Sequence, residues 1–454
     1  MDSMTRQIAA YACEPTPDIF PDAIVSGARR VLLDSMGCAL GGIGSEPVAI
    51  ARKLVLGGAP SAYPGRVLGS NARASGESAA FINSAMIRYL DFNDIHHGSH
   101  PSEMIGALLA LAEASGADGA RLLDSIIVAY EVGLRLVRAT EMRERGWDQG
   151  FAIGIGAAAG IGNLLGLPFD RIAHAVAITA VSNIPMRATR AGNLSLWKGA
   201  ATAFSCRNAV FATLLAAEGM TGPDKPLEGR HGLWEQVTGP FELAPFPTEG
   251  GDYLLPATML KYWPVEGNLL TAVQAALELR EKIALEDIVA IDIDTYWSAW
   301  HETASEEEKW TPTNRETADH SMPYVFARAF TDGAITVASF DTDKVADPAL
   351  RPLMQMIKVH HSDEVEAIYK ATYPFTYFLR VTATGRDGGK SVIEVRNHRG
   401  TSQNPMNDEE VKEKFRILAE PVLGADRAAA AAQTWGAIDE NDLSTALDML
   451  EPPE

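Results

Sequence analysis

Lys261-Tyr262-Trp263-Pro264 is the stretch of sequence at which the character of the chain changes. Before it, Ala, Leu and Gly dominate, and apolar side chains recur at helical spacing. The segments with this spacing are 20–41, 76–90, 101–115, 120–138, 152–165, 169–182 and 199–218. Residues 1–263 are therefore predicted to form a large all-helical region.

After this stretch the pattern is mixed. We expect Asn268 to cap a helix that runs to Arg280. Residues 289–294 alternate between apolar and polar or small side chains, as a half-buried strand does. Two further strands are predicted at 376–384 and 390–397, joined by the hairpin turn Arg386-Asp387-Gly388-Gly389. From Asn407 to Leu450 the pattern is helical again, so these last helices are candidates to rejoin the first region.

Composition restricts the partners and the compartment. The chain has 454 residues, enough for two domains, and a formal net charge of −20, which argues against nucleic acid and anionic membranes as partners. Three widely spaced cysteines and an N-terminus without the features of a signal peptide lead us to expect a cytoplasmic protein. The Gly- and Ala-rich segment 150–166 is too short to span a membrane, and we interpret it as a tightly packed internal helix.

The densest group of chemically active side chains lies in the stretch from Leu90 to Glu103. Pro101 suits the first turn of a helix, so His100 is expected near the helix N-cap. There the helix dipole disfavours imidazolium and free N–H groups favour an anion, which places His100 to exchange protons beside a bound carboxylate. This segment is a candidate acid–base site.

Two simpler interpretations of the same stretch remain open. Asp91 and Asp94 are residue types that often close a loop or cap a helix. His96, His97 and His100 could instead bind a transition metal, but adjacent histidines seldom point at one ion, and the sequence has no HExxH or CxxC partner. We therefore predict no metal site.

A second group is basic. Arg187, Arg190 and Lys198 lie close together in an acidic chain, with Arg207 on the following helix. Arginine binds carboxylates with two parallel hydrogen bonds, so these side chains could hold a substrate with several carboxylates. A solvated basic helix face is the alternative interpretation.

Two more groups lie near the change in sequence pattern. Lys261 stands at the expected domain boundary, where a partly desolvated lysine could transfer protons. The run from Glu316 to Tyr324 combines acid, imidazole and hydroxyl groups before a predicted helix. Its alternative interpretation is that Asp319 caps that helix and His320 is merely buried.

Several of these motifs, taken together in their order along the chain, resemble those of a known family. Five ordered blocks resemble the MmgE/PrpD family: Leu-Asp-Phe-Asn-Asp with His-Pro-Ser from residue 90, Leu-Trp-Lys-Gly-Ala-Ala from 196, Glu-Gly-Met-Thr-Gly-Pro from 218, Lys-x-x-Pro-x-Glu from 261, and Arg-Glu-Thr-Ala-Asp-His-Ser-x-Pro-Tyr from 315. The family includes 2-methylcitrate dehydratase, cis-aconitate decarboxylase and an iminodisuccinate epimerase. The resemblance implies a homodimer whose large helical domain is built from residues 1–263 and 405–454, with an α+β lid domain, residues 264–404, inserted between them.

The resemblance also implies site residues. Asp91, His100, Lys261 and Tyr324 would be the catalytic groups in the cleft between the two domains. The substrate-binding residues would be Asn93, Arg187, Arg190, Lys198 and His320.

The chain departs from the family pattern at four positions. Ile95 stands where many relatives have Thr, and Gln149 follows Asp148 where dehydratases have Asp-His. Asn268 replaces a histidine, and Leu194 stands where decarboxylases have a lysine. These departures raise the chance of a different acid substrate.

The expected chemistry is proton transfer at a carbon beside a carboxylate, without a cofactor. For a dehydration, His100 or Lys261 would be the base and Asp91 or Tyr324 would protonate the departing hydroxyl. Burial between Leu90 and Phe92 would raise the pKa of Asp91 for that role. Three hypotheses follow: a hydro-lyase acting on a 2-methylcitrate-like acid, a decarboxylase or epimerase acting on a related acid, and a non-catalytic protein that binds tricarboxylates.

Overall fold

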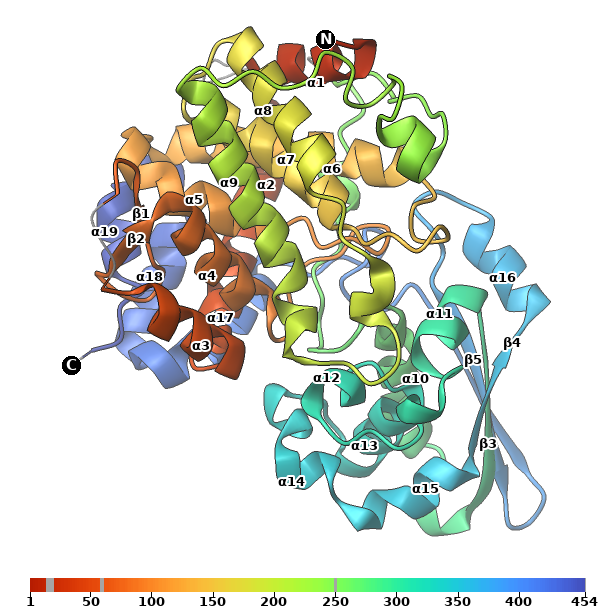
Figure 1. Ribbon diagram of the computed structural model, residues 1–454. Coiled ribbons are helices and arrows are strands. Elements are labelled where there is room, and N and C mark those ends of the chain that lie inside the picture. Colours follow the sequence, from red (N-terminus) through yellow and green to blue (C-terminus); the bar gives the residue numbers. More distant parts are fainter. Residues whose placement is uncertain (14–19, 58–60, 249–250, 454) are drawn as a thin grey trace.

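The computed structural model describes residues 1–13, 20–57, 61–248 and 251–453. Most of these residues belong to a helical body, and a smaller α+β part packs beside it (Figure 1). The predicted fold class, mainly α with an added α+β domain, is confirmed. None of the described helices is long and apolar enough to span a membrane.

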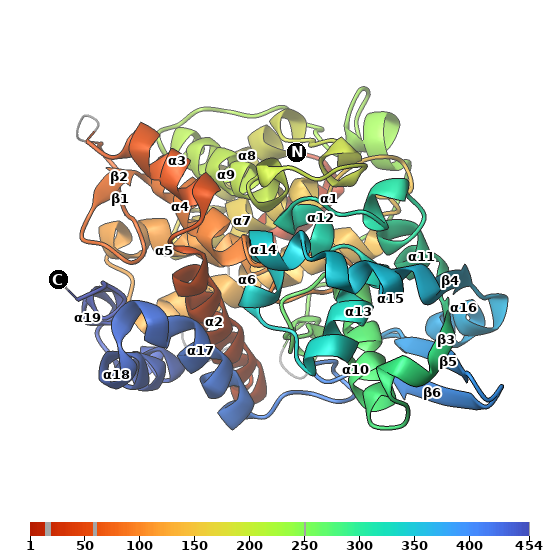
Figure 2. The same ribbon diagram turned by 90° about the horizontal axis from the view of Figure 1, so that it is seen from below.

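The helical body is built from both ends of the chain. Its first part contains α1 (Ser3–Cys13), α2 (Asp22–Gly42), α3 (Glu46–Val55), α4 (Gly76–Arg88), α5 (Glu103–Ser115), α6 (Gly119–Ala139), α7 (Gly150–Leu164), α8 (Phe169–Ser182) and α9 (Ala201–Ala217), with a short hairpin of β1 (Pro64–Arg66) and β2 (Arg73–Ser75). The second part contains α17 (Asp408–Leu423), α18 (Ala425–Gly436) and α19 (Leu443–Asp448). Their buried side chains join the same hydrophobic core, and Figure 2 shows α17 beside α2.

Helix α7 is the internal helix that its composition predicts, because all of its residues are buried. A Cβ atom on Gly160 would lie 2.7 Å from the Cβ of Ala129, and one on Gly156 would lie 2.8 Å from the Ala129 carbonyl oxygen. Glycine therefore allows α6 and α7 to pack closely.

The α+β part contains α10 (Leu270–Arg280), β3 (Ile288–Thr295), α11 (Trp297–Thr303), α12 (Arg315–Ala318), α13 (Met322–Asp332), α14 (Thr342–Val345), α15 (Arg351–Met356), β4 (Ile357–His361), α16 (Asp363–Lys370), β5 (Phe378–Gly385) and β6 (Lys390–Arg396). The sheet order is β4-β3-β5-β6, with β3 and β4 parallel and the other neighbours antiparallel. Helices α10 and α13 cover one face of this sheet (Figure 2). The predicted hairpin is confirmed, since β5 and β6 pair around residues 386–389.

One predicted cap is wrong. Helix α10 begins at Leu270, and Asn268 lies within a short 3-10 helix, Gly267–Leu269. The Glu266 side chain accepts the backbone N–H of Asn268 at 2.8 Å, so Glu266 provides the cap.

The loop between α4 and α5 joins the two parts. The backbone of Ile95 forms two hydrogen bonds with Met259, both 2.9 Å, and its side chain packs into the core of the α+β part. At the other end, Lys414 of α17 donates to the carbonyl oxygens of Phe92 (2.6 Å) and Lys261 (2.9 Å). The acid–histidine stretch is therefore held where the two parts meet.

Candidate functional site

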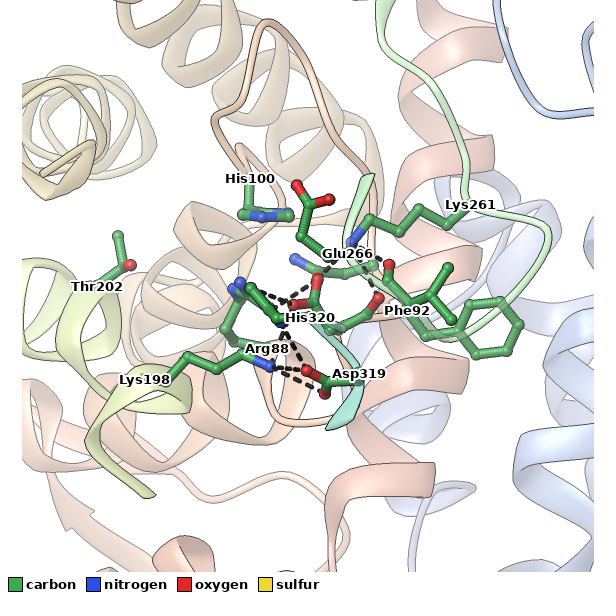
Figure 3. A network of polar contacts seen from close by, with 12 residues as sticks. Arg88, Phe92, His100, Lys198, Thr202, Lys261, Glu266, Asp319 and His320 are labelled. Carbon is green, nitrogen blue, oxygen red and sulfur yellow. Dashed lines mark hydrogen bonds and ion pairs between the residues drawn. The ribbon is translucent and has the colours of Figure 1, made fainter. Parts of the chain in front are cut away.

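The Asp91 carboxylate is the centre of a buried network of charges. Figure 3 shows Arg88, Lys198, Lys261, Asp319 and His320 of this network. Asp91 has a left-handed backbone with φ of 50°, which is strained for a residue with a side chain. Arg88 contacts its carboxylate at 3.0 Å and Lys198 at 3.2 Å, and Lys261 forms a third ion pair. Burial alone would raise the pKa of Asp91, but these cations hold it well below its usual value. Asp91 is therefore ionised, which contradicts its expected role as a proton donor.

Lys261 is fully buried and all three of its N–H groups have acceptors. Its Nζ atom donates to the carbonyl oxygens of Asp91 and Val265, both at 2.9 Å, and to the Asp91 carboxylate. Burial lowers the pKa of Lys261. Because no N–H group is left over, the geometry assigns Lys261 to holding Asp91 in place and does not favour the expected role as a base.

Lys198 is equally buried, and its partner is Asp319. The Nζ atom lies 2.8 and 2.9 Å from the two carboxylate oxygens of Asp319. This ion pair replaces the expected contact with substrate, because Lys198 is 1% exposed and is not among the residues that line a described cavity.

His320 and Asp319 form an acid–imidazole pair. Nδ1 of His320 lies 2.6 Å from the Asp319 carboxylate, which accepts its hydrogen. Burial, then the nearby Lys198, lowers the pKa of His320 to about 4, so the ring is neutral. The Nε2 atom therefore keeps its lone pair, 3.7 Å from Asp91 Oδ2. The helix cap expected at Asp319 is instead supplied by Ser321, whose hydroxyl accepts the N–H of Tyr324.

Among the described residues, Asp91, Asp319 and His320 are close enough to bind one metal ion. However, the ammonium group of Lys198 already lies between the two carboxylates. Lysine therefore supplies the positive charge that a metal would bring, and these residues do not fit a metal site.

His100 has a single preferred protonation state. Its Nδ1 atom lies 2.8 Å from the Asp94 carbonyl oxygen, which can only accept, so the proton is on Nδ1. Burial, followed by the charge of Arg88, places its pKa well below the usual value. A neutral ring with an unprotonated Nε2 results. Helix α5 begins at Glu103 after the cap residue Ser102, so His100 lies slightly further from the helix than expected.

His100 and His320 line a small cavity, the inner cavity, of about 30 Å³ between the helical body and the α+β part. The other lining residues are Arg88, Ile95, Gly98, Arg143, Asp148, Gln149, Arg187, Arg190, Glu266 and Glu302. Gly98 has φ of 73°, and a Cβ atom there would lie 1.9 Å from Arg143 Nη1. Glycine at this position therefore makes room for the guanidinium group.

The inner cavity carries excess positive charge. Arg190 lies 2.8 Å from Asp148, and Arg187 and Arg143 share Glu302. Burial opposes ionisation of both Asp148 and Glu302, but the arginines lower the pKa of each carboxyl. The guanidinium groups of Arg143, Arg187 and Arg190 thus meet two ionised lining carboxylates, and Arg88 contacts Asp91. Positive charge is therefore in excess at the inner cavity. Arg187 and Arg190 therefore lie where a bound carboxylate would need them.

Glu266 is the lining carboxyl suited to donate a proton. Burial raises its pKa to about 7, with Lys261 acting in the opposite direction. Its oxygens accept the backbone and side-chain N–H groups of Asn268 at 2.8 and 2.9 Å.

Several residues that line the inner cavity were not predicted as site residues from the sequence. Two of them had a signal there: Arg88 stands one helical turn before Asp91, and Glu266 lies in the Lys-x-x-Pro-x-Glu block. Arg143 and Glu302 had none.

Besides Asp91, Lys198 and Lys261, two more expected site residues do not line the inner cavity. The Tyr324 hydroxyl donates to the Ser339 carbonyl oxygen at 2.6 Å inside the core of the α+β part. Asn93 is fully buried and donates to the Ser102 hydroxyl at 2.9 Å. Both are thus placed to stabilise the fold, and the catalytic role expected of Tyr324 has no support in the geometry.

The remaining residues of the acid–histidine stretch have structural partners. Asp94 accepts the Ser102 N–H at 3.0 Å and the Tyr130 hydroxyl at 2.7 Å, which closes the loop. His96 lies 2.9 Å from the Tyr373 hydroxyl, and His97 stacks on Phe375. The three histidines of the stretch therefore have different partners and do not share one ion.

The four departures from the family pattern lie in different places. Ile95 and Gln149 line the inner cavity, and Gln149 accepts the backbone N–H of His100 at 2.6 Å. Asn268 accepts the Tyr296 hydroxyl at 2.9 Å. Leu194 is buried and its N–H donates to the Thr317 hydroxyl, so it does not line the cavity.

Comparisons with known proteins show which proteins this chain resembles. The MmgE/PrpD N-terminal domain matches residues 6–245, and the MmgE/PrpD C-terminal domain matches residues 263–437. The chain is 28% identical to a 2-methylcitrate dehydratase of Salmonella typhimurium over 81% of this chain and 80% of the relative. It is 30% identical to a fungal alkylcitrate dehydratase over 68% and 65%, and 25% identical to the cis-aconitate decarboxylase of Mus musculus over 94% and 88%.

Proposed function

The chain belongs to the MmgE/PrpD family, and on this premise we propose that it is a lyase that dehydrates a hydroxy-tricarboxylic acid similar to 2-methylcitrate. The relatives that support the proposal are dehydratases and a decarboxylase, which are all lyases. The observation that carries it is the inner cavity, where two neutral imidazoles and a carboxyl with a raised pKa lie among arginines.

Binding begins with the carboxylates of the substrate. The excess positive charge of this buried site attracts a carboxylate strongly, because the surrounding protein screens charge less than water does. Arg187 and Arg190 present planar guanidinium groups that can form paired hydrogen bonds with a carboxylate. The same charges stabilise the extra negative charge that develops when a proton leaves the neighbouring carbon.

His100 is the proposed base. Its Nδ1–H bond to the Asp94 carbonyl oxygen leaves the Nε2 lone pair for the carbon-bound proton of the substrate. A bound dianion would favour the imidazolium that forms, which offsets the effect of burial on the pKa. Asp91 and Lys261 hold the surrounding loop in position without touching the substrate.

Glu266 is the proposed acid. The departing hydroxyl group needs a proton, and the carboxyl of Glu266 has a pKa of about 7, so both its protonated and its ionised form are populated at neutral pH. When Glu266 gives this proton to the hydroxyl, water leaves and a carbon–carbon double bond forms. A proton then passes from His100 to solvent and Glu266 is reprotonated.

Incubation of the purified protein with 2-methylcitrate, followed by proton NMR, tests this function. We expect the methyl doublet of the substrate to be replaced by the allylic methyl singlet of 2-methylaconitate, without release of CO2. Glu266→Gln should slow the reaction by about 10²–10⁴-fold if Glu266 is the acid. Turnover of other hydroxy acids but not of any tricarboxylate would contradict the proposal.

Epimerisation is the second candidate, because His100 and His320 both leave Nε2 unprotonated at the same cavity. Two bases could remove a proton from one side of a carbon and return it to the other. In D2O, epimerisation of an amino or imino dicarboxylate would incorporate deuterium without loss of water. Dehydration would instead yield an alkene, so one NMR experiment separates the two.

We also propose that the enzyme is a homodimer. The helical body has a groove of about 1030 Å³ lined in part by Trp197 and Phe204, which are 46% and 41% exposed, and Phe211 on the same helix as Phe204 is 53% exposed. Exposed apolar surface of this kind favours association between protein chains. Light scattering after size-exclusion chromatography should give twice the mass of the 48.8 kDa chain.

The proposal includes a cytoplasmic location and no cofactor. Dehydration moves a proton and a hydroxide and transfers no electrons, so acid–base groups suffice. We expect turnover to survive prolonged dialysis against EDTA, and cell fractionation to recover the protein with cytoplasmic markers.

A further inference from the structure

A second cavity adjoins the inner cavity. This outer cavity has a volume of about 190 Å³. It shares five lining residues with the inner cavity, which are Ile95, Gly98, Arg143, Gln149 and Glu266. The two cavities are therefore neighbours, with these residues between them.

The inner cavity is too small for a whole tricarboxylic acid. About 10–15 Å³ is needed for one water molecule, so a volume of about 30 Å³ holds little more than a water or one carboxylate group. Part of any substrate whose carboxylate contacts the inner arginines must extend toward the outer cavity. The chemistry of the outer walls therefore bears on which substrates fit.

The outer cavity has an aromatic wall. The ring of Phe375 stacks on His97 at 5.0 Å and on Tyr369 at 4.5 Å. Burial, followed by the charge of Arg143, lowers the pKa of His97 to about 4, so this ring is uncharged. Val137 and Met142, both buried, add aliphatic surface.

Charged groups at the outer cavity are mostly engaged with each other. Glu366 pairs with Lys370 at 2.7 Å and also accepts the backbone N–H of Trp297. Arg143 contacts Glu302 on the inner side. Glu144, which also lines the outer cavity, would repel a further carboxylate, whereas an apolar group would meet aromatic and aliphatic surface.

Ile95 is an apolar residue that lines both cavities. Its backbone is fixed by two hydrogen bonds to Met259, and its side chain lies over Gly267. A Cβ atom at position 267 would come within 2.4 Å of Ile95 Cδ1, so glycine is needed for this packing. A carbon chain that leaves the inner cavity would pass this side chain.

We infer that the substrate carries an apolar substituent of several carbons, which occupies the outer cavity while its carboxylates bind the arginines of the inner cavity. This inference rests on the proposed function and narrows it to acids with an alkyl or aryl chain longer than methyl. The substituent would add binding free energy through the hydrophobic effect, because each methylene buried against the aromatic wall is removed from water.

A chain-length series tests the inference on the unmodified protein. Citrates that carry methyl, propyl and pentyl groups at carbon 2 are compared by kcat/KM, with alkene formation followed by NMR. Burial of one methylene is worth about a fourfold gain in kcat/KM, so propyl and pentyl should both exceed methyl. A constant or falling kcat/KM along the series would overturn the inference while leaving the dehydratase proposal intact. If no member formed an alkene, the proposed function itself would fail.

Ile95→Phe provides the matching variant. A larger side chain at this position should lower the ratio of pentyl to methyl kcat/KM at least tenfold. Val289→Phe is the control, because Val289 is exposed on β3 and lines neither cavity, so the ratio should not change. If Ile95→Phe does not fold, Phe375→Leu removes part of the aromatic wall, and the same ratio should fall. An unchanged ratio in the folded variant would contradict the inference.

Discussion

The inner and outer cavities share five side chains but differ in what surrounds them. The inner cavity is lined by four arginines and two neutral imidazoles, and the outer cavity has stacked aromatic rings on one side. The difference indicates that the two cavities have separate functions. The inner groups perform proton transfer, and the outer surface selects the substrate. Such a division lets substrate preference change without altering the acid and base.

The largest effect is expected for His100→Ala, which removes the proposed base from the inner cavity. General acid–base catalysis contributes about 10²–10⁴-fold, so kcat should fall within this range. His96→Gln is the matched control, since His96 lies in the same loop but bonds to Tyr373 outside the inner cavity. Steady-state kinetics on 2-methylcitrate would measure both, and full turnover by His100→Ala would remove His100 from the mechanism.

A large effect on stability is expected for Asp91→Asn. The substitution leaves Lys261, Lys198 and Arg88 buried without their shared carboxylate, and breaking a buried ion pair costs about 3–5 kcal/mol. Urea unfolding should therefore show a much lower free energy of unfolding. Asp292→Asn, which alters an exposed pair with His360, should change this free energy by less than about 1 kcal/mol.

The pH dependence of kcat/KM tests whether Glu266 is the proton donor. A proton donor must be protonated, so activity should be full below the pKa of Glu266, about 7, and fall about tenfold per pH unit above it. Glu266→Gln should abolish this alkaline fall in kcat/KM at the same time as it lowers the rate. An alkaline limb that persists in Glu266→Gln would mean that another group supplies the proton.

The smallest effect is expected for Tyr324→Phe. The hydroxyl bonds to the Ser339 carbonyl oxygen in the α+β core, so its loss should cost about 1 kcal/mol of stability. Because Tyr324 lines neither cavity, kcat should stay within twofold of the unmodified protein. A loss of kcat as large as that of His100→Ala would restore the catalytic role that the sequence motif suggests.

Local patterns predicted the elements well where one face of an element is buried. The segments expected at 169–182 and 390–397 match α8 and β6 to within a residue. Short helices of the α+β part, such as α14 and α15, were missed because four to six residues do not show a full helical period. Asn268 was misplaced as a cap because the competing acceptor, Glu266, stands two residues earlier.

The candidate site was predicted in part. His100, Arg187, Arg190 and His320 were named from the sequence and line the inner cavity. Lys198 and Lys261 were named as well, but they pair with carboxylates. Arg143 and Glu302 were missed, because neither belongs to a motif and only the fold brings them to Arg187.

The sequence by itself determined the types of the main helices and strands, the family and the loop that carries the chemistry. The tertiary structure decided which groups hold protons. Asp91 is ionised because Lys261, 170 residues away, and Lys198 lie against it, and the pKa of Glu266 is raised to about 7 because it is buried. A pKa depends on desolvation and on neighbouring charges in space, and neither quantity can be read from the order of residues along the chain.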